Sequence, residues 1–150
     1  MQKLNLPRYD FKFSDEGGRR TIFDPFRKKY VLLTPEEWVR QSFVRYLTEE
    51  KDYPASLIMT EQALHLNRMI KRCDVIVHKP AGNPVLLIEC KAPGVQITGD
   101  SFDQVSRYNI VFRVKYLMVT NGLKHYCCRV DFESRQLEFL NDLPCYGELD

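Results

Sequence analysis

Two strongly apolar segments, separated by a short stretch typical of a tight turn, constrain the fold of this sequence most. Residues 72–79 and 85–92 are rich in Val, Ile and Leu, and residues 80–84 read Pro-Ala-Gly-Asn-Pro. Runs of β-branched and other apolar residues favour strands, and Pro, Gly and Asn between them favour a turn. We therefore expect an antiparallel hairpin over residues 72–92.

The centre of the turn sets the register of this hairpin. A turn centred between residues 81 and 82 predicts three cross-strand pairs: Pro80 with Asn83, His78 with Val85, and Asp74 with Glu89. Facing side chains of an antiparallel pair lie about 5 Å apart. Lys91 follows Glu89 by two residues, so it should project from the same face as the two carboxylates. The alternate positions should point into a core; they are Val75, Val77, Leu86, Ile88 and Cys90.

Two facing carboxylates need a partner that offsets their repulsion. Like charges opposite each other destabilise a strand pair, and burial would raise the pKa of one of them. A divalent cation such as Mg²⁺ or Mn²⁺ removes the repulsion, because it prefers hard oxygen ligands. Lys91 could then orient a water molecule or stabilise charge that develops on phosphorus. The alternative is a solvated strand face, on which Lys91 and Arg72 form salt bridges with the acids; a bulge would also alter the register.

The rest of the sequence predicts an α/β fold with a mixed sheet. A helix should begin after Thr34, which is a good N-cap, with Pro35 at its first position and Glu37 completing a capping box. It should end before Tyr53-Pro54. We expect a second helix near residues 100–114 and further strands over residues 57–66, 116–120, 126–132 and 136–140. This order indicates a central mixed sheet flanked by helices.

The charge balance excludes a strongly basic binding protein but not a nucleic-acid enzyme. The 150 residues hold 22 Lys and Arg against 20 Asp and Glu, so the chain is not a strongly basic, histone-like binder. A nucleic-acid enzyme stays possible, because the placement of charge matters more than its total. We expect a single domain over residues 1–150, with a core at 34–140. Residues 1–33 should form a basic extension or hairpin, either as a solvated arm or in contact with phosphate.

The composition also bears on location and on cysteine chemistry. The longest apolar run covers only residues 85–88, and the first residues lack the apolar core of a signal peptide. We therefore expect a cytoplasmic protein. Five cysteines cannot all pair within one chain, and their spacing fits no zinc motif, so we expect all of them to be reduced. The aromatic residues are expected in the core rather than as platforms for base stacking.

The same residues carry a family resemblance. An acid at the end of one strand, Asp74, followed by Glu-x-Lys on the next, Glu89-Cys90-Lys91, resembles the PD-(D/E)XK nuclease superfamily. The order of the flanking segments is similar to the amino-terminal nuclease domain of type I restriction enzyme R subunits. These segments are residues 72–77, 84–93, 103–108 and 119–122, with Gln104 and Tyr108 forming a Gln-x-x-x-Tyr element. The position before Asp74 is Cys73 rather than proline, which the superfamily tolerates.

The resemblance implies a fold and a set of site residues. The fold would be a restriction-endonuclease-like α/β core. Asp74 and Glu89 would ligate Mg²⁺ together with the backbone carbonyl of Cys90, and Lys91 would be the catalytic lysine. Gln104 and Tyr108 would handle DNA near the site; without the resemblance they could equally be a polar pair on one helical face.

Many relatives place a further glutamate on the first helix. Glu36 and Glu37 are both candidates here, and Glu36 shares a helical stripe with Val39, Phe43 and Leu47. We therefore assign Glu36 to the metal. The alternative is that both are simply exposed acids favoured at a helix N-terminus.

The function implied by the resemblance is a Mg²⁺-dependent DNA endonuclease, with Mn²⁺ as a substitute ion. The sequence contains no GxxxxGK[ST] phosphate-binding loop, so no motor function is expected. Its partners would be DNA and separately encoded restriction-modification subunits, with a homodimer as a possibility and no membrane. The alternative is a non-catalytic DNA-binding or subunit-docking module on the same fold.

Overall fold

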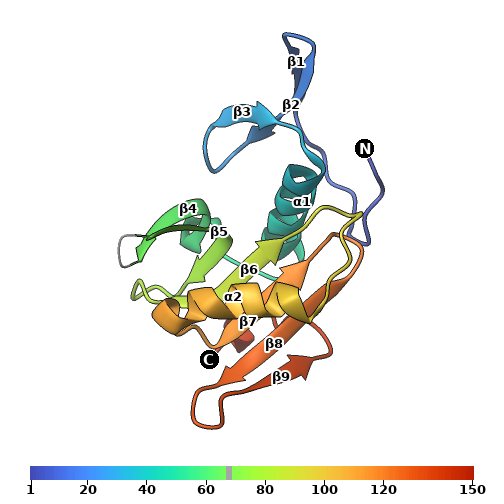
Figure 1. Cartoon of the computed structure of the whole chain (residues 1–150). Coiled ribbons are helices and arrows are strands. Elements are labelled where there is room, and N and C mark those ends of the chain that lie inside the picture. Colours follow the sequence, from blue (N-terminus) through green and yellow to red (C-terminus); the bar gives the residue numbers. More distant parts are fainter. Residues whose placement is uncertain (67–68) are drawn as a thin grey trace.

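The computed structural model describes residues 1–66 and 69–150, and the side chains of these residues apart from 61–66, 69–72, Tyr108, Ile110 and Val111. It contains two sheets and two main helices (Figure 1). The small sheet is formed by β1 (Phe13–Glu16), β2 (Arg19–Asp24) and β3 (Lys29–Leu32). The helices are α1 (Pro35–Glu50) and α2 (Gly99–Phe112). The strands of the large sheet are β4 (Ile58–Leu66), β5 (Met69–His78), β6 (Pro84–Cys90), β7 (Tyr116–Thr120), β8 (His125–Asp131) and β9 (Gln136–Leu140).

The large sheet is mixed, as the sequence predicts. Its strands lie in the order β4-β5-β6-β7-β8-β9. β6 and β7 pair in parallel, and each of the other neighbouring pairs is antiparallel. A parallel pair needs a long crossover, and α2 supplies it between β6 and β7. Within the described residues, no helix combines the length and the apolar character needed to cross a membrane.

The two helices cover opposite faces of the large sheet. On one face, Val39, Phe43 and Leu47 of α1 pack in a core with the alternate positions of β5 and β6. These positions are the ones expected from the sequence, Val75, Val77, Leu86, Ile88 and Cys90. On the other face, Phe102 and Val105 of α2 pack against Ile76, Leu87 and Leu117. Both faces of β6 are therefore buried, which fixes the strand that carries Glu89.

The β5–β6 hairpin has the expected register over its central part, and a bulge changes it near the turn. Val75 pairs with Ile88 and Val77 with Leu86. The register shifts between Val77 and His78, so His78 pairs with Pro84 and not with Val85. The expected pair of Pro80 and Asn83 is wrong for the same reason, since the Lys79 amide donates to the Asn83 carbonyl at 2.8 Å. Pro84 has no amide hydrogen to give to a ladder, which favours a bulge at this point.

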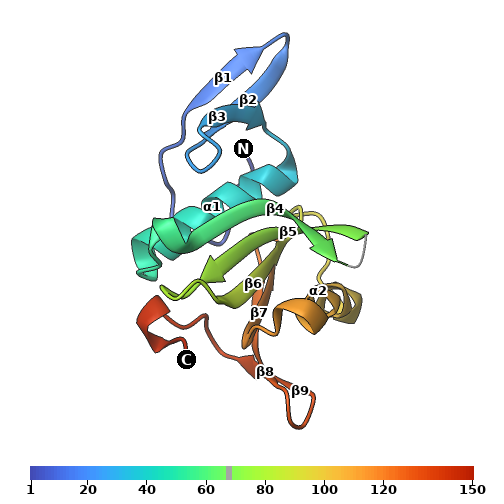
Figure 2. The same ribbon diagram turned by 90° about the vertical axis from the view of Figure 1, so that its left-hand side faces the viewer.

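Residues 13–32 form the small sheet, which lies beside the start of α1 and extends away from β8 and β9 (Figures 1 and 2). Gly17 and Gly18 connect β1 to β2 with φ of 57° and 79°, a conformation that glycine adopts without strain. Ile22 of β2 is fully buried. The aromatic residues do not all lie in the core as expected, because Phe13 is 37% exposed and Tyr30 is 40% exposed.

A buried ionic cluster joins the small sheet to α1. Arg40 of α1 donates from Nε to Glu37 at 2.9 Å and from a terminal nitrogen to Asp24 at 2.9 Å. Arg27, in the turn after β2, donates to Asp24 at 2.5 Å and to Glu37 at 2.9 Å. Gln41 donates to the same Glu37 oxygen at 3.0 Å. The side chains of Asp24, Glu37 and Arg40 are nearly inaccessible to solvent, so the cluster fixes how the two layers meet.

This cluster corrects the expected capping box. The hydroxyl of Thr34 does cap α1, because it accepts the amide of Glu37 at 3.0 Å. The Glu37 side chain does not return to the cap residue. It turns inward to Arg27, Arg40 and Gln41, because two guanidinium groups outweigh one main-chain amide as partners for a carboxylate.

The cluster predicts a large difference between two glutamates of the same helix. We expect Glu37→Gln to lower the free energy of unfolding by about 3 kcal/mol, because it leaves a buried guanidinium without full charge compensation. Glu49→Gln is the matched control: Glu49 is exposed and meets Arg45 at 3.7 Å, so its loss should cost below about 1 kcal/mol. Urea denaturation of both variants measures the difference. Equal costs would mean that the cluster does not hold the two layers together.

Candidate active site

The candidate site lies where the β5–β6 ladder ends. The ladder ends at the pair of Val75 and Ile88, and Asp74 and Glu89 are the next residue on each strand. Oδ2 of Asp74 accepts the amide of Cys90 at 2.7 Å, so the Asp74 side chain reaches across to β6 beside Glu89. The two acids are therefore neighbours, as the sequence register predicts.

Glu89 is the most constrained of these groups. It is only 7% exposed, and its Oε1 lies 3.3 Å from the Nζ of Lys91. Its other oxygen, Oε2, is buried and has no hydrogen-bond partner among the described residues. Burial, and then the charge of Asp74, raises the pKa of Glu89 from about 4.5 to about 8, although Lys91 acts in the opposite direction. Such an atom is a natural ligand for a cation, because buried polar atoms are normally satisfied.

Lys91 brings α2 into the site. Its Nζ lies 3.3 Å from Glu89 and also 3.1 Å from Oε1 of Gln104, an exposed residue of α2. The ammonium group is thus held between a carboxylate of the sheet and an amide of the helix. Tyr108, the second member of the Gln-x-x-x-Tyr element, lies on α2, but its side chain is outside the described residues.

Glu36 faces the site from the first turn of α1. A hollow of about 380 Å³ is lined by residues from α1 and its cap, by Asp74 of β5 and by Ala92, which follows β6. Glu36 and Asp74 lie on its wall together with Arg40. Glu37 also lines the hollow, but its side chain is held in the ionic cluster described above. Glu36 and Asp74 therefore share the wall of one hollow.

The donor set suits a hard cation that keeps part of its water shell. Asp74 and Glu89 offer carboxylate oxygens, and the backbone carbonyl of Cys90 lies between Glu89 and Lys91 in sequence. The Cys90 thiol is not a candidate ligand, because it is fully buried in the core and burial raises its pKa. Over the described residues, no three His, Cys, Asp or Glu side chains are gathered as a ready metal cage. Mg²⁺ is commonly bound by one or two carboxylates and several waters, so two acids are sufficient.

The buried cluster around Arg40 is the part of this region that the sequence does not reveal. Its one local signal is the spacing of Glu37, Arg40 and Gln41, which places the arginine and the glutamine within one helical turn of the acid. Asp24 and Arg27 come from another layer, and nothing in their pattern indicates where they meet α1.

Comparisons with known proteins assign most of the chain to a family. The family described as Type I restriction enzyme R protein N terminus matches residues 35–144, which is more than two thirds of the chain. The chain belongs to this family. The matched range contains the residues of the candidate site, Glu36, Asp74, Glu89, Lys91 and Gln104. No curated protein sequence matches the chain significantly.

A solved structure supports the fold. A fragment assigned as the HsdR subunit of a type I restriction enzyme from Vibrio vulnificus YJ016 superposes with a TM-score of 0.59 at 18% sequence identity. The superposition covers 78% of this chain and 24% of that one, so the chain spans about a quarter of that relative's length. The fold of this R-subunit family member is thus the restriction-endonuclease-like α/β core that the sequence suggested.

The environment of Glu89 predicts a pH-dependent stability in the absence of metal. Between about pH 4.5 and pH 8 the folded chain binds the Glu89 proton more tightly than the unfolded chain, so stability falls as the pH rises. Glu89→Gln removes this loss and keeps an oxygen for Lys91. In EDTA, we expect the variant to match the wild type near pH 4.5 and to exceed its free energy of unfolding by a margin that grows as the pH rises to about 9.

Urea denaturation at several pH values measures this effect, and Glu133→Gln provides the control. Glu133 is exposed in the turn between β8 and β9, and it donates its main-chain amide to Asp131, a bond that the substitution keeps. A constant difference between Glu89→Gln and wild type across the pH range would contradict the assigned environment of Glu89.

Proposed function

We propose that this chain is a Mg²⁺-dependent DNA endonuclease domain that hydrolyses phosphodiester bonds. Membership of the R-subunit family provides the restriction-enzyme context. The observation that carries the proposal is the convergence of two acids and a lysine: the buried Glu89 carboxyl lies close enough to Asp74 to interact with it directly, and its Oε1 lies 3.3 Å from the Nζ of Lys91. Two acids and a lysine that converge in this way suit metal-assisted hydrolysis better than they suit stability.

Each residue then has a role. Asp74 and Glu89 would hold the ion with the Cys90 carbonyl, and Glu36 would act from the wall of the hollow that it shares with Asp74. When bound, the ion supplies Lewis acidity and positive charge at the reacting phosphate. The Lys91 ammonium would orient the attacking water and stabilise negative charge on the phosphate oxygens. Gln104 accepts a hydrogen bond from Lys91 and so restricts where that charge can lie.

We further propose that the domain acts on DNA as part of a restriction-modification complex. Membership of the R-subunit family supports this context, and the chain spans about a quarter of the solved relative. Selection of a cleavage position would then come from its partners.

Two substitutions test the activity. We expect Asp74→Asn and Lys91→Met each to lower the rate of plasmid cleavage in Mg²⁺ or Mn²⁺ at least about 100-fold, because one removes a charged ligand and the other the cation beside the water. Lys124→Met is the control, since Lys124 is exposed and bonds to Asn121 through its main-chain amide and carbonyl, which the substitution keeps. Cleavage by both site variants at the wild-type rate would refute the assignment.

Calorimetry with Mn²⁺ separates a nuclease from a module that binds DNA without cutting it. The wild type should bind the ion, and Asp74→Asn should bind it at least about tenfold more weakly. DNA binding by a wild-type chain that takes up no ion would favour the non-catalytic module.

A further inference from the structure

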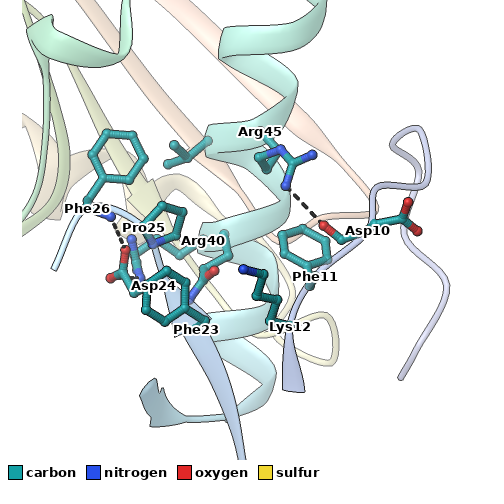
Figure 3. A pocket seen from close by; sticks show the side chains of 11 residues that line it. Asp10, Phe11, Lys12, Phe23, Asp24, Pro25, Phe26, Arg40 and Arg45 are labelled. Carbon is teal, nitrogen blue, oxygen red and sulfur yellow. Dashed lines mark hydrogen bonds and ion pairs between the residues drawn. The ribbon is translucent and has the colours of Figure 1, made fainter. Parts of the chain in front are cut away.

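A small aromatic pocket lies between the small sheet and α1, apart from the acids of the candidate site (Figure 3). Its volume is about 240 Å³. Three phenylalanines line it, Phe11 before β1, Phe23 in β2 and Phe26 after it, and Gln41 and Val44 of α1 complete the wall. Phe11 and Phe23 are half-buried; the Phe11 ring packs edge to face with Trp38 and the Phe23 ring with Tyr30, each at 5.3 Å between ring centres.

Two basic side chains, Lys12 and Arg45, lie over the faces of these rings. Lys12 is exposed, and its Nζ lies 5.9 Å from the centre of the Phe23 ring. The Arg45 guanidinium lies 5.4 Å from the centre of the Phe11 ring and donates to the Asp10 carbonyl at 3.1 Å. Figure 3 shows the Lys12 amine directed between Phe11 and Phe23, while the Asp10 carboxylate points away from them.

Arg45 meets Glu49 at 3.7 Å outside the pocket, and an acid that lines the pocket is engaged elsewhere. Asp24 lines the pocket, but its carboxylate is held by Arg27 and Arg40. Burial alone would raise the pKa of Asp24, and the two arginines outweigh it and lower that pKa. Aromatic faces with cations beside them match a nucleotide, because a base stacks on the ring and a phosphate meets the cation. A protein partner fits less well, since lysine is depleted in protein interfaces.

The pocket is next to the candidate active site along α1. Arg40 lines both this pocket and the hollow that contains Glu36 and Asp74. Because Arg40 lines both places, a DNA strand that follows α1 would pass the hollow and then the pocket.

We propose that this pocket holds an unstacked nucleobase of the DNA strand whose phosphodiester lies at Asp74 and Glu89, with Lys12 and Arg45 contacting the flanking phosphates. The inference rests on the proposed function, because it takes DNA as the substrate. It goes beyond the family, since Phe11, Lys12, Phe23 and Phe26 all precede the matched residues 35–144. The small sheet would thereby help to hold the strand beside the acids of the candidate site.

The experiment measures binding in the absence of cleavage. Single-stranded oligonucleotides that each carry one abasic residue, at successive positions, are titrated with the full chain in Ca²⁺ by fluorescence anisotropy. We expect one position to bind wild type at least about fivefold more weakly than the intact strand, because stacking of a base contributes about 1–3 kcal/mol. Phe23→Leu keeps the wall apolar but removes the ring, so it should bind the intact strand as weakly as wild type binds that abasic strand.

A matched pair of lysines tests the phosphate contact. Lys12→Ala should weaken binding of every oligonucleotide and reduce the slope of log affinity against log salt by about one. Lys29→Ala makes the same change at an exposed position of the same sheet that does not line the pocket, and it should leave the slope unchanged. Equal effects of the two variants would overturn the proposal, because the sheet would then attract DNA by its overall charge.

The outcomes distinguish this inference from the proposed function. Equal binding of all abasic strands by a wild type that cleaves plasmid would refute the pocket alone. A position-dependent abasic effect in a chain that does not cleave would support the pocket and refute the nuclease. Circular dichroism of Phe23→Leu and Lys12→Ala confirms that each variant is folded before its affinity is interpreted.

Discussion

The carboxylates of Asp74 and Glu89 repel each other, and the arrangement of the chain depends on holding them together. The two acids do not hold themselves together; the paired apolar residues of the same two strands hold them in place. Val75 with Ile88 and Val77 with Leu86 fix the register, and cores on both faces of the sheet prevent β6 from slipping by one residue. The packing of the core thus supplies the free energy that offsets the repulsion between the two acids.

Most of this arrangement could be predicted from the sequence, because it rests on local patterns. The alternation of apolar residues set the strands, and β7 and β9 have the predicted bounds. The symmetry of the turn placed Asp74 next to Glu89, and the parity of strand positions placed Lys91 beside them. The bulge at His78 escaped prediction because a one-residue shift in a turn leaves no trace in hydrophobic periodicity. It lies at the opposite end of the hairpin from Asp74, so the expected neighbours still meet.

Contacts between layers were beyond prediction. Glu37 has the spacing of a capping-box residue, yet its carboxylate accepts hydrogen bonds from two arginines, Arg40 of the same helix and Arg27 from the turn after β2. The approach of Gln104 to Lys91 was indicated only by the family resemblance, because a helix packed on a sheet can present several of its faces. The aromatic residues of the small sheet were misjudged because composition alone does not say which face of a three-stranded sheet stays open to solvent.

The attachment of the small sheet through Arg40 has a consequence for exchanging parts between relatives. Arg40 lies inside the range that matches the family, whereas its partner Asp24 lies outside it. A foreign amino-terminal segment grafted onto this core would have to carry an acid at the equivalent point, or a buried guanidinium would lose half of its compensation. Compatibility of a chimaera is thus decided by one carboxylate rather than by overall sequence similarity.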